Sequence, residues 1–494
     1  MTGQTTEGNA ASAIARRSLR GSLYSVASSA ITLSLGFARS LLLARWLAPE
    51  QFGVMTLALF FTDLLNRFRD LGYDQDLLRD KAPSDVKVST HFVLQITSSV
   101  GMLLVCLALI PAWQHSYPDR PLLVPVILVL AAGRVVAALG GTPVIMLRKE
   151  LGFGRAAGID LVKAFIKTGG VLALAWLGAG VWALVAEDLL ETLVLVVAIW
   201  WVHPVRLKWC WDREVIRGYL SFGLPLFVAQ LIAFLLMQFD DFWVGTVLGD
   251  ASLGFYAIAY GFAEYPRRVV SDPIQQVILA TLAKVQDDRL RLSQAFYRSS
   301  AYLVRVGVWA GGVFALVAPE FVRTFIGDKW LPAVSAFRLL VVFAMSLPLV
   351  AVAINLLVAT GESRQILRVR SAQLAVFVPL VILGVRAWGI LGAALAEDVM
   401  VLVGLIVLLR RVRQHVDFSL GKLLACPMLG MAVGMGLVWG VVPKLGVQSD
   451  LGLMAVKGML ATLGYAATLL LLERRECRLA LAWGLRALRH GEQG

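Results

Sequence analysis

Residues 47–69 read LAPEQFGVMTLALFFTDLLNRFR, and residues 248–270 read LGDASLGFYAIAYGFAEYPRRVV. The two stretches align without gaps at an offset of 201 positions, which places Gly53 on Gly254. Both stretches are apolar over most of their length. The chain therefore contains an internal duplication of a hydrophobic, helix-forming segment.

Each copy also carries an acid that is followed four residues later by an arginine. In the first copy these are Asp63 and Arg67, and in the second copy they are Glu264 and Arg268. Residues four apart lie on one face of an α-helix. Charges inside membrane helices are costly and usually face a cavity or one another. A duplicated membrane bundle with a charged interior is typical of transporters rather than of enzymes that make bonds.

The composition of the whole chain agrees with a membrane location. The chain has 494 residues, of which 58% are hydrophobic, and its mean hydropathy is +0.75. Soluble domains hold about 45–50% apolar residues including glycine, so the excess predicts many membrane spans. The first apolar run, residues 22–47, is too long for a signal-peptide core and is predicted to remain as the first helix.

Apolar runs of about 20 residues, the length that crosses the hydrocarbon core, predict an all-α polytopic membrane protein with about fourteen transmembrane helices. The predicted spans are 22–47, 52–73, 89–112, 122–146, 157–177, 181–202, 218–248, 252–282, 295–326, 332–359, 366–385, 388–409, 420–442 and 451–472. Lysine and arginine collect in alternate loops between these spans. Since cytoplasmic loops carry such an excess, both termini are predicted to be cytoplasmic.

A second repeat supports the duplication. Residues 183–188 (ALVAED) resemble residues 393–398 (AALAED) at an offset of 210. The two repeats together predict pseudo-symmetric six-helix lobes at 21–205 and 206–415, related by an axis along the membrane normal. Chance similarity between apolar segments is the alternative explanation.

The remaining segments flank these lobes. They are a cytoplasmic tail at 1–20, two further helices at 416–473 and a basic tail at 474–494. We interpret the basic tail either as an amphipathic helix on the inner leaflet or as a frayed polar end.

Seven arginines are predicted to lie inside the spans or at their inner ends. They are Arg39, Arg67, Arg69, Arg134, Arg267, Arg268 and Arg305. Because the planar guanidinium group binds phosphate oxygens in pairs, we interpret these arginines as the lining of a cationic substrate-binding cavity between the lobes. For the four at the inner ends of their helices, the alternative is that the side chains snorkel to the cytoplasmic surface.

Nine acidic residues in the same segments are candidates for charge pairing or for binding a coupling proton or sodium ion. They are Asp63, Asp160, Glu187, Asp188, Asp240, Asp241, Glu264, Glu397 and Asp398. Asp160 can pair with Lys163 on the same helical face. The two Glu-Asp pairs are explained equally well as partners of basic residues on neighbouring helices. The five histidines are scattered, and the pattern assigns them no role.

No motif in the sequence predicts an enzyme or a metal site. Walker A and H-E-x-x-H motifs are absent, and Asp240-Asp241 lacks the third acid of a D-D-x-x-D magnesium site. The four cysteines have neither disulfide nor zinc spacing. The net charge of +13 lies mainly in alternate loops, which argues against nucleic-acid binding. No cofactor is expected beyond coupling to an H⁺ or Na⁺ gradient or to the membrane potential.

Two segments carry a resemblance to a known family: residues 45–55 (RWLAPEQFGVM) and residues 68–79 (FRDLGYDQDLLR). Over about residues 16–475 the chain resembles the polysaccharide-transport family, the Wzx-type oligosaccharide-lipid flippases of the multidrug/oligosaccharidyl-lipid/polysaccharide exporter superfamily. Asp74 and Asp76 depart from the family pattern, which often has small or uncharged residues there.

The resemblance implies a function in surface polysaccharide synthesis, such as exopolysaccharide or lipopolysaccharide. The implied activity is alternating-access transfer of an undecaprenyl-pyrophosphate-linked repeat unit across the bacterial inner membrane. The implied partners are this lipid-linked oligosaccharide, membrane lipids, a polysaccharide polymerase and a chain-length regulator. Two alternatives stay open: an ion-coupled multidrug antiporter of the same fold, and a non-transporting scaffold of a polysaccharide assembly complex.

Overall fold

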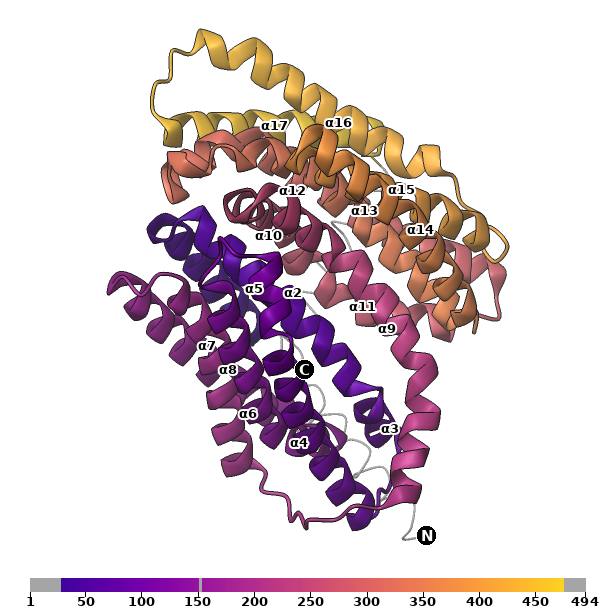
Figure 1. Cartoon of the computed structure of the whole chain (residues 1–494). Coiled ribbons are helices and arrows are strands. Elements are labelled where there is room, and N and C mark those ends of the chain that lie inside the picture. Colours follow the sequence, from indigo (N-terminus) through magenta and orange to yellow (C-terminus); the bar gives the residue numbers. More distant parts are fainter. Residues whose placement is uncertain (1–27, 151–152, 475–494) are drawn as a thin grey trace. The chain divides into compact units, whose positions relative to one another are not determined.

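A computed structural model describes residues 28–150 and 153–474, and every regular element within these ranges is helical (Figure 1). Residues 28–46 form the first described helix. It is followed by α2 (Pro49–Asp70), α3 (Tyr73–Arg79), α4 (Asp85–Ala108), α5 (Ile110–Ser116), α6 (Leu123–Lys149), α7 (Phe153–Trp176), α8 (Val181–Val202), α9 (Arg213–Leu248), α10 (Asp250–Val270), α11 (Asp272–Lys284), α12 (Arg289–Phe321), α13 (Ala333–Ala359), α14 (Ser363–Trp388), α15 (Ile390–Val412), α16 (Leu420–Val441) and α17 (Asp450–Leu472). The predicted tail at 1–20 and nearly all of the tail at 474–494 lie outside the described residues.

Three predicted spans differ from the helices that the structure has. The third span, predicted as continuous over 89–112, is made of α4 and α5, which are separated at Leu109. The second span continues beyond α2 into the short helix α3, across a corner where Leu71 and Gly72 have φ values of 23° and 80°. Positive φ values interrupt α-helical hydrogen bonding, so the helix ends there. The eighth span, predicted as continuous over 252–282, is made of two helices, α10 and α11, which are separated at Ser271.

Nine of the described helices are long and apolar enough to cross a membrane: α4, α6, α9, α12, α13, α14, α15, α16 and α17. The polytopic, all-helical prediction is confirmed by this finding. The other long helices, α2, α7, α8 and α10, carry charged side chains within their length. The count of fourteen transmembrane helices stays a prediction.

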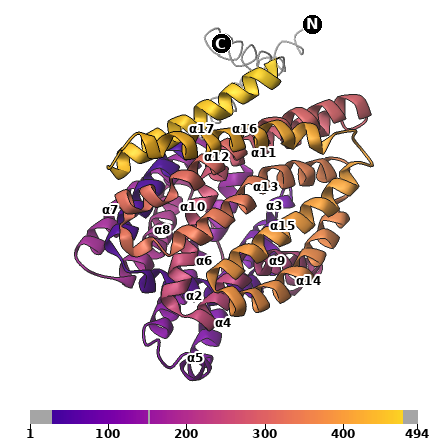
Figure 2. The same ribbon diagram turned by 90° about the horizontal axis from the view of Figure 1, so that it is seen from above.

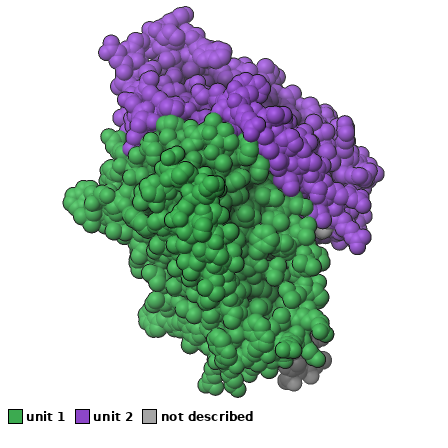
Figure 3. Space-filling view, viewed as in Figure 1, with its two compact units in different colours: residues 1–257 green, residues 258–494 purple. Residues whose placement is uncertain are grey.

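The chain divides into two compact units, Met1–Ala257 and Ile258–Gly494, which we call unit 1 and unit 2 (Figure 3). Helix α9 and the first turns of α10 therefore belong to unit 1. The predicted lobes at 21–205 and 206–415 stay a prediction.

The duplicated glycines, Gly53 of α2 and Gly254 of α10, make a reciprocal contact within unit 1. A Cβ atom on Gly53 would lie 1.9 Å from the carbonyl oxygen of Asp250, and one on Gly254 would lie 1.9 Å from that of Pro49. Pro49 and Asp250 are also 201 positions apart. The two copies of the repeat therefore pack against each other symmetrically, as surfaces do across a two-fold axis.

Unit 2 is a second helical bundle, to which the two C-terminal helices belong. Helix α14 packs against α15 and α16 against α17, and α12 contacts both α13 and α17 (Figure 2). One buried apolar cluster includes Leu282, Phe296, Leu357, Val412 and Ala461, from α11, α12, α13, α15 and α17. Burial of this apolar surface, at about 25 cal/mol per Å², stabilises the packing of α16 and α17 on the rest of unit 2.

Candidate functional site

Arg39 lies in the first described helix and is held by residues of two other helices of unit 1. Its Nη2 donates to Glu187 Oε1 of α8 over 2.6 Å, and its Nη1 donates to Thr168 Oγ1 of α7 over 3.3 Å. The side chain of Arg39 is 11% exposed. A short hydrogen bond between two ionised groups is about twice as strong as a neutral one, so Glu187 fixes the direction of the guanidinium group.

Arg134 of α6 joins two acids that are far apart in the sequence. Its Nη2 lies 3.0 Å from Asp63 Oδ1 of α2 and 3.5 Å from Asp188 Oδ1 of α8. Asp63 is therefore hydrogen-bonded to Arg134 and not to Arg67, the residue one turn later that the repeat suggested. The first copy of the acid–arginine pair thus connects three helices.

A ladder of alternating charges continues along α7 and α8. Lys163 lies 3.1 Å from both Asp160 and Glu191, and Lys167 lies 2.7 Å from Glu191 and 3.5 Å from Glu187. Through Glu187 the ladder reaches Arg39. We call this set the unit 1 charge network, and its members are Arg39, Asp63, Arg134, Asp160, Lys163, Lys167, Glu187, Asp188 and Glu191.

Sequence reasoning gave Glu191 no role, although the structure places it between two lysines. Glu191 is four residues after Glu187, so both acids lie on one face of α8. This spacing could have predicted that Glu191 belongs to the same set of charges. The structure also brings Glu187 and Asp188 onto basic residues of neighbouring helices. That arrangement agrees with the charge-pairing interpretation of these two acids.

Two further predicted arginines of unit 1 lie on the last turns of α2. The Arg67 guanidinium is 5.8 Å from the centre of the Phe234 ring of α9. Arg69 donates to Ser99 Oγ of α4 over 3.0 Å. Neither of these two contacts is with an acidic side chain.

In the second copy, which lies in unit 2, the acid pairs with arginines of its own helix, α10. The Glu264 side chain is 6% exposed and accepts from Arg267 Nη2 over 2.9 Å and from Arg268 Nη2 over 2.7 Å. Arg267 also pairs with Asp272 at 2.9 Å. The two copies therefore share a sequence pattern but differ in their bonding partners.

Arg305 of unit 2 fastens α12 to the end of α17. Its Nε and Nη2 donate to the two carboxylate oxygens of Glu473 over 2.7 and 2.8 Å, and Tyr465 donates to its carbonyl oxygen. The same helices are joined further along by Lys457 and Glu320, which are 2.6 Å apart. The structure thus places Arg305 in a bidentate ion pair between two helices.

The remaining acidic candidates lie on two helices. On α9 of unit 1, Asp240 is 1% exposed and accepts from the Tyr256 hydroxyl over 2.6 Å, and Asp241 adjoins it. On α15 of unit 2, Glu397 and Asp398 are both buried. Across residues 28–150 and 153–474, no group of three or more His, Cys, Asp or Glu side chains is placed to hold a metal ion.

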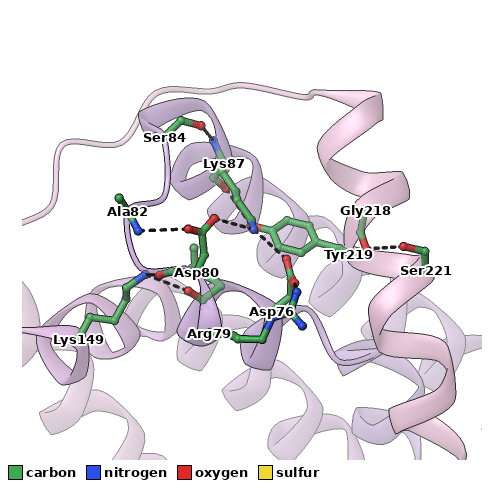
Figure 4. A network of polar contacts seen from close by, with 11 residues as sticks. Asp76, Arg79, Asp80, Ala82, Ser84, Lys87, Lys149, Gly218, Tyr219 and Ser221 are labelled. Atoms are coloured by element: carbon green, nitrogen blue, oxygen red, sulfur yellow. Dashed lines mark hydrogen bonds and ion pairs between the residues drawn. The ribbon is translucent and has the colours of Figure 1, made fainter.

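A polar cluster that sequence reasoning did not assign lies where α3, α4, α6 and α9 meet (Figure 4). Lys87 Nζ lies 2.9 Å from a carboxylate oxygen of both Asp76 and Asp80, and the Tyr219 hydroxyl donates to the Lys87 carbonyl. Lys149 donates to the Asp80 carbonyl. Hydrogen bonds from Lys87 and the Ala82 amide hold the pKa of Asp80 below its usual value. The sequence feature that could have indicated this cluster is the polar stretch after α2. It includes Asp76, an acid that departs from the family pattern.

Comparison with solved structures supports the fold. The lipid II flippase MurJ, in an inward closed conformation, matches 92% of this chain and 99% of its own chain with a TM-score of 0.74 at 13% identity. An inward-facing multidrug resistance MATE family transporter of the MOP superfamily matches 80% of this chain and 98% of its own with a TM-score of 0.55 at 16% identity.

Comparison of sequences identifies relatives in polysaccharide synthesis. The lipopolysaccharide biosynthesis protein WzxC of Escherichia coli (strain K12) is 24% identical over 391 residues, which cover 77% of each chain. The succinoglycan biosynthesis transport protein ExoT of Rhizobium meliloti (strain 1021) is 24% identical over 313 residues, or 62% of each chain. The family model described as "Polysaccharide biosynthesis protein" matches residues 42–335. The chain therefore belongs to the polysaccharide biosynthesis protein family, in agreement with the resemblance found in its sequence.

Proposed function

We propose that this protein is a flippase. It moves undecaprenyl-pyrophosphate-linked oligosaccharide units across the bacterial inner membrane by alternating access, for the synthesis of a surface polysaccharide. Three findings support the proposal: the family, a relative named as a succinoglycan transport protein, and a fold shared with a lipid II flippase. The proposed location is the inner membrane, with both termini in the cytoplasm.

The observation that carries the proposal is the spare hydrogen-bonding capacity of the unit 1 arginines. In the described chain, the buried Nε–H groups of Arg39, Arg67, Arg69 and Arg134 have no acceptor. A buried donor without an acceptor costs about 1–3 kcal/mol. A pyrophosphate has several strong acceptor oxygens, which can accept from donors of this kind.

The acids of the network have a defined role in this proposal. Glu187 and Asp63 hold Arg39 and Arg134 in place while no substrate is bound. When pyrophosphate enters, it competes with these carboxylates for the same guanidinium groups. Because the carboxylates can take the place of the pyrophosphate on the guanidinium groups, the site can release its substrate as well as bind it. Transport requires both steps.

The proposal excludes a chemical reaction on the substrate and includes two kinds of partner. A polymerase that consumes the flipped units and a chain-length regulator are the proposed protein partners. Transport is proposed to be driven by an H⁺ or Na⁺ gradient or by the membrane potential.

A multidrug antiporter is the second candidate, because a MATE family transporter shares the fold. Antiporters of cationic drugs need an acidic, aromatic binding site. The unit 1 charge network holds five acids and four basic residues, so its net charge does not separate the two candidates. The buried Nε–H groups without an acceptor on four arginines of unit 1 favour an anion. Drug resistance on overexpression, without any effect on surface polysaccharide, would support the antiporter.

The test uses a strain from which the gene has been deleted. Deletion should cause lipid-linked repeat units to accumulate on the inner leaflet, and the wild-type gene should restore polymer export. Arg39→Ala and Arg134→Ala should not restore export although the proteins reach the membrane. Arg291→Ala is the matched control, since Arg291 is 76% exposed and pairs with Asp288, three residues before it. Export at the wild-type level by both network variants would refute the assignment.

A further inference from the structure

His91 is a buried polar side chain that the proposed substrate site does not use. It lies on α4 with an exposed fraction of 0%. Its Nδ1 is 2.9 Å from Thr142 Oγ1 of α6, and its Nε2 is 3.0 Å from Asp74 Oδ1 of α3. Gln95, one turn later on α4, donates to the same Asp74 oxygen over 2.9 Å. The imidazole ring is thus bonded at both nitrogens by groups from two other helices.

The two partners of His91 accommodate both protonation states of the ring. In the neutral ring, Nε2–H donates to Asp74, and Nδ1 accepts from the Thr142 hydroxyl. In the charged ring both nitrogens donate, and a hydroxyl oxygen and a carboxylate can each accept. Rotation of the Thr142 hydroxyl is the only adjustment required, so a proton can bind at Nδ1 without movement of heavy atoms.

Charged and titratable groups near the ring lie on α2, α3, α4 and α9, while α6 contributes the Thr142 hydroxyl. They are Arg69 and Asp70 of α2, Tyr73, Asp74 and Asp76 of α3, Lys87 of α4 and Tyr219 of α9. Lys87 lies one turn before His91, but its charge is balanced by Asp76 and Asp80. Asp74 is the acid in direct contact with the ring.

Asp74 is suited to stabilise a charged ring. Burial would raise the pKa of Asp74, but hydrogen bonds from His91 and Gln95 and the charge of Arg69 outweigh burial and lower it. The carboxylate is therefore ionised at neutral pH. Its side chain is 32% exposed, so water reaches the carboxylate that faces Nε2 of the ring.

We propose that the His91 imidazole, held between Asp74 and Thr142, is the proton-binding site that couples transport to a proton gradient. This inference rests on the proposed flippase function. The proton binds at Nδ1 in one half of the cycle and leaves from the same atom in the other, with no other bond made or broken. Binding converts the contact of α3 with α4 into a full ion pair.

The position of α3 explains how this local change reaches other helices. The helix has seven residues and directly follows the corner at Leu71 and Gly72. A Cβ atom on Gly223 of α9 would lie 1.6 Å from the Leu71 carbonyl oxygen, so this corner is in tight contact with α9. Protonation of His91 strengthens its contact with Asp74 and therefore stabilises the arrangement in which α3 contacts both α4 and α9.

The first arm of the test measures proton binding without substrate. Full-length protein with ¹⁵N-labelled histidine is reconstituted in lipid nanodiscs, and the imidazole nitrogens are followed by NMR as the pH changes. His91→Gln identifies the His91 signals by their loss. The inference requires the nitrogen signals of this ring to change with pH. Asp74→Asn removes the acid in contact with the ring and should change the pH dependence of those signals.

Thr142→Val provides a second variant that keeps both His91 and Asp74. It removes the acceptor for Nδ1–H and should also change the pH dependence of the ring signals. A ring that stays neutral in the wild-type protein down to about pH 5 would overturn the inference, whatever the transport results show.

The second arm measures transport in proteoliposomes that contain fluorescently labelled undecaprenyl-pyrophosphate-linked oligosaccharide. With one coupled proton, a difference of one pH unit should change the final distribution of substrate about tenfold. His91→Gln should abolish this response. His415→Gln is the matched control, because His415 also pairs with an acid, Glu362, at 3.0 Å but is partly exposed in unit 2.

The outcomes separate the inference from the proposed function. Absence of flipping by the wild-type protein would refute the flippase and the coupling together. Flipping that responds to the pH gradient equally in wild type and His91→Gln would refute the coupling site alone. Loss of the response in His91→Gln but not in His415→Gln supports the inference.

Discussion

At the scale of single residues, several ion pairs join side chains that are far apart in the sequence. Arg39 and Glu187 are separated by 148 positions, and Arg305 and Glu473 by 168. Spacing along one helix predicts contacts only between residues three or four apart. The Glu264–Arg268 contact is of this kind and could be predicted, whereas the bond of Asp63 to Arg134 depends on how α2 packs against α6.

A double-mutant cycle tests the Arg39–Glu187 bond. Glu187→Gln should lower the free energy of unfolding, because it leaves Arg39 charged and largely buried without its main partner. Arg39→Gln combined with Glu187→Gln removes both charges and should recover much of the loss. The coupling energy should lie between about 0.5 and 3 kcal/mol, measured by thermal unfolding in detergent. Additive single-variant effects would show that the two groups do not interact.

At the scale of helices, hydrophobic runs predicted where helices form, because that pattern is local. They did not predict that the chain turns at Ser271, or that α3 separates from α2 at Leu71 and Gly72. Backbone conformation at a single residue decides such breaks, and hydropathy averaged over a span does not detect it. The positions of the duplicated glycines were visible in the sequence, but their mutual contact was not.

Alanine substitutions test that contact. Gly53→Ala and Gly254→Ala should each destabilise the protein by about 1–3 kcal/mol, because the added methyl group meets backbone atoms that cannot move aside. Gly36→Ala is the control, since a Cβ atom there has nothing within 4 Å. Thermal unfolding of the purified variants measures the effect. Equal stability of all three variants would contradict the packing described here.

The ion pairs between α12 and α17 make a separate prediction for these helices. Lys457→Met should leave Glu320 buried and unpaired, since the Glu320 side chain is 7% exposed. Hydrogen exchange of α17 should then become faster, while exchange of α14 and α15 stays unchanged. The double variant Lys457→Met with Glu320→Leu should restore slow exchange, because an apolar pair can replace a buried ion pair. Unchanged exchange in Lys457→Met would show that the pair does not hold α17.

At the scale of the whole molecule, the duplication gave both units an acid–arginine pair, but the pairs have diverged. In unit 2, Glu264 pairs with Arg268 within α10. In unit 1, Asp63 pairs with Arg134, which also contacts Asp188, so three helices are joined. The membrane-protein class, the helical fold and the family could be predicted from composition, repeats and two short segments. The unit 1 charge network could not, because its members come from five helices whose packing is not encoded in any local pattern.

The central claim is that the arginines of the unit 1 charge network bind the pyrophosphate of the substrate. The most direct measurement is the rate at which proteoliposomes flip undecaprenyl-pyrophosphate-linked oligosaccharide, compared between wild type and the charge-neutral double variant Arg39→Gln, Glu187→Gln. Loss of a charge-assisted hydrogen bond of about 1.5–3 kcal/mol predicts that the double variant folds normally and flips at least about tenfold more slowly. Flipping by the folded double variant at the wild-type rate would contradict the claim.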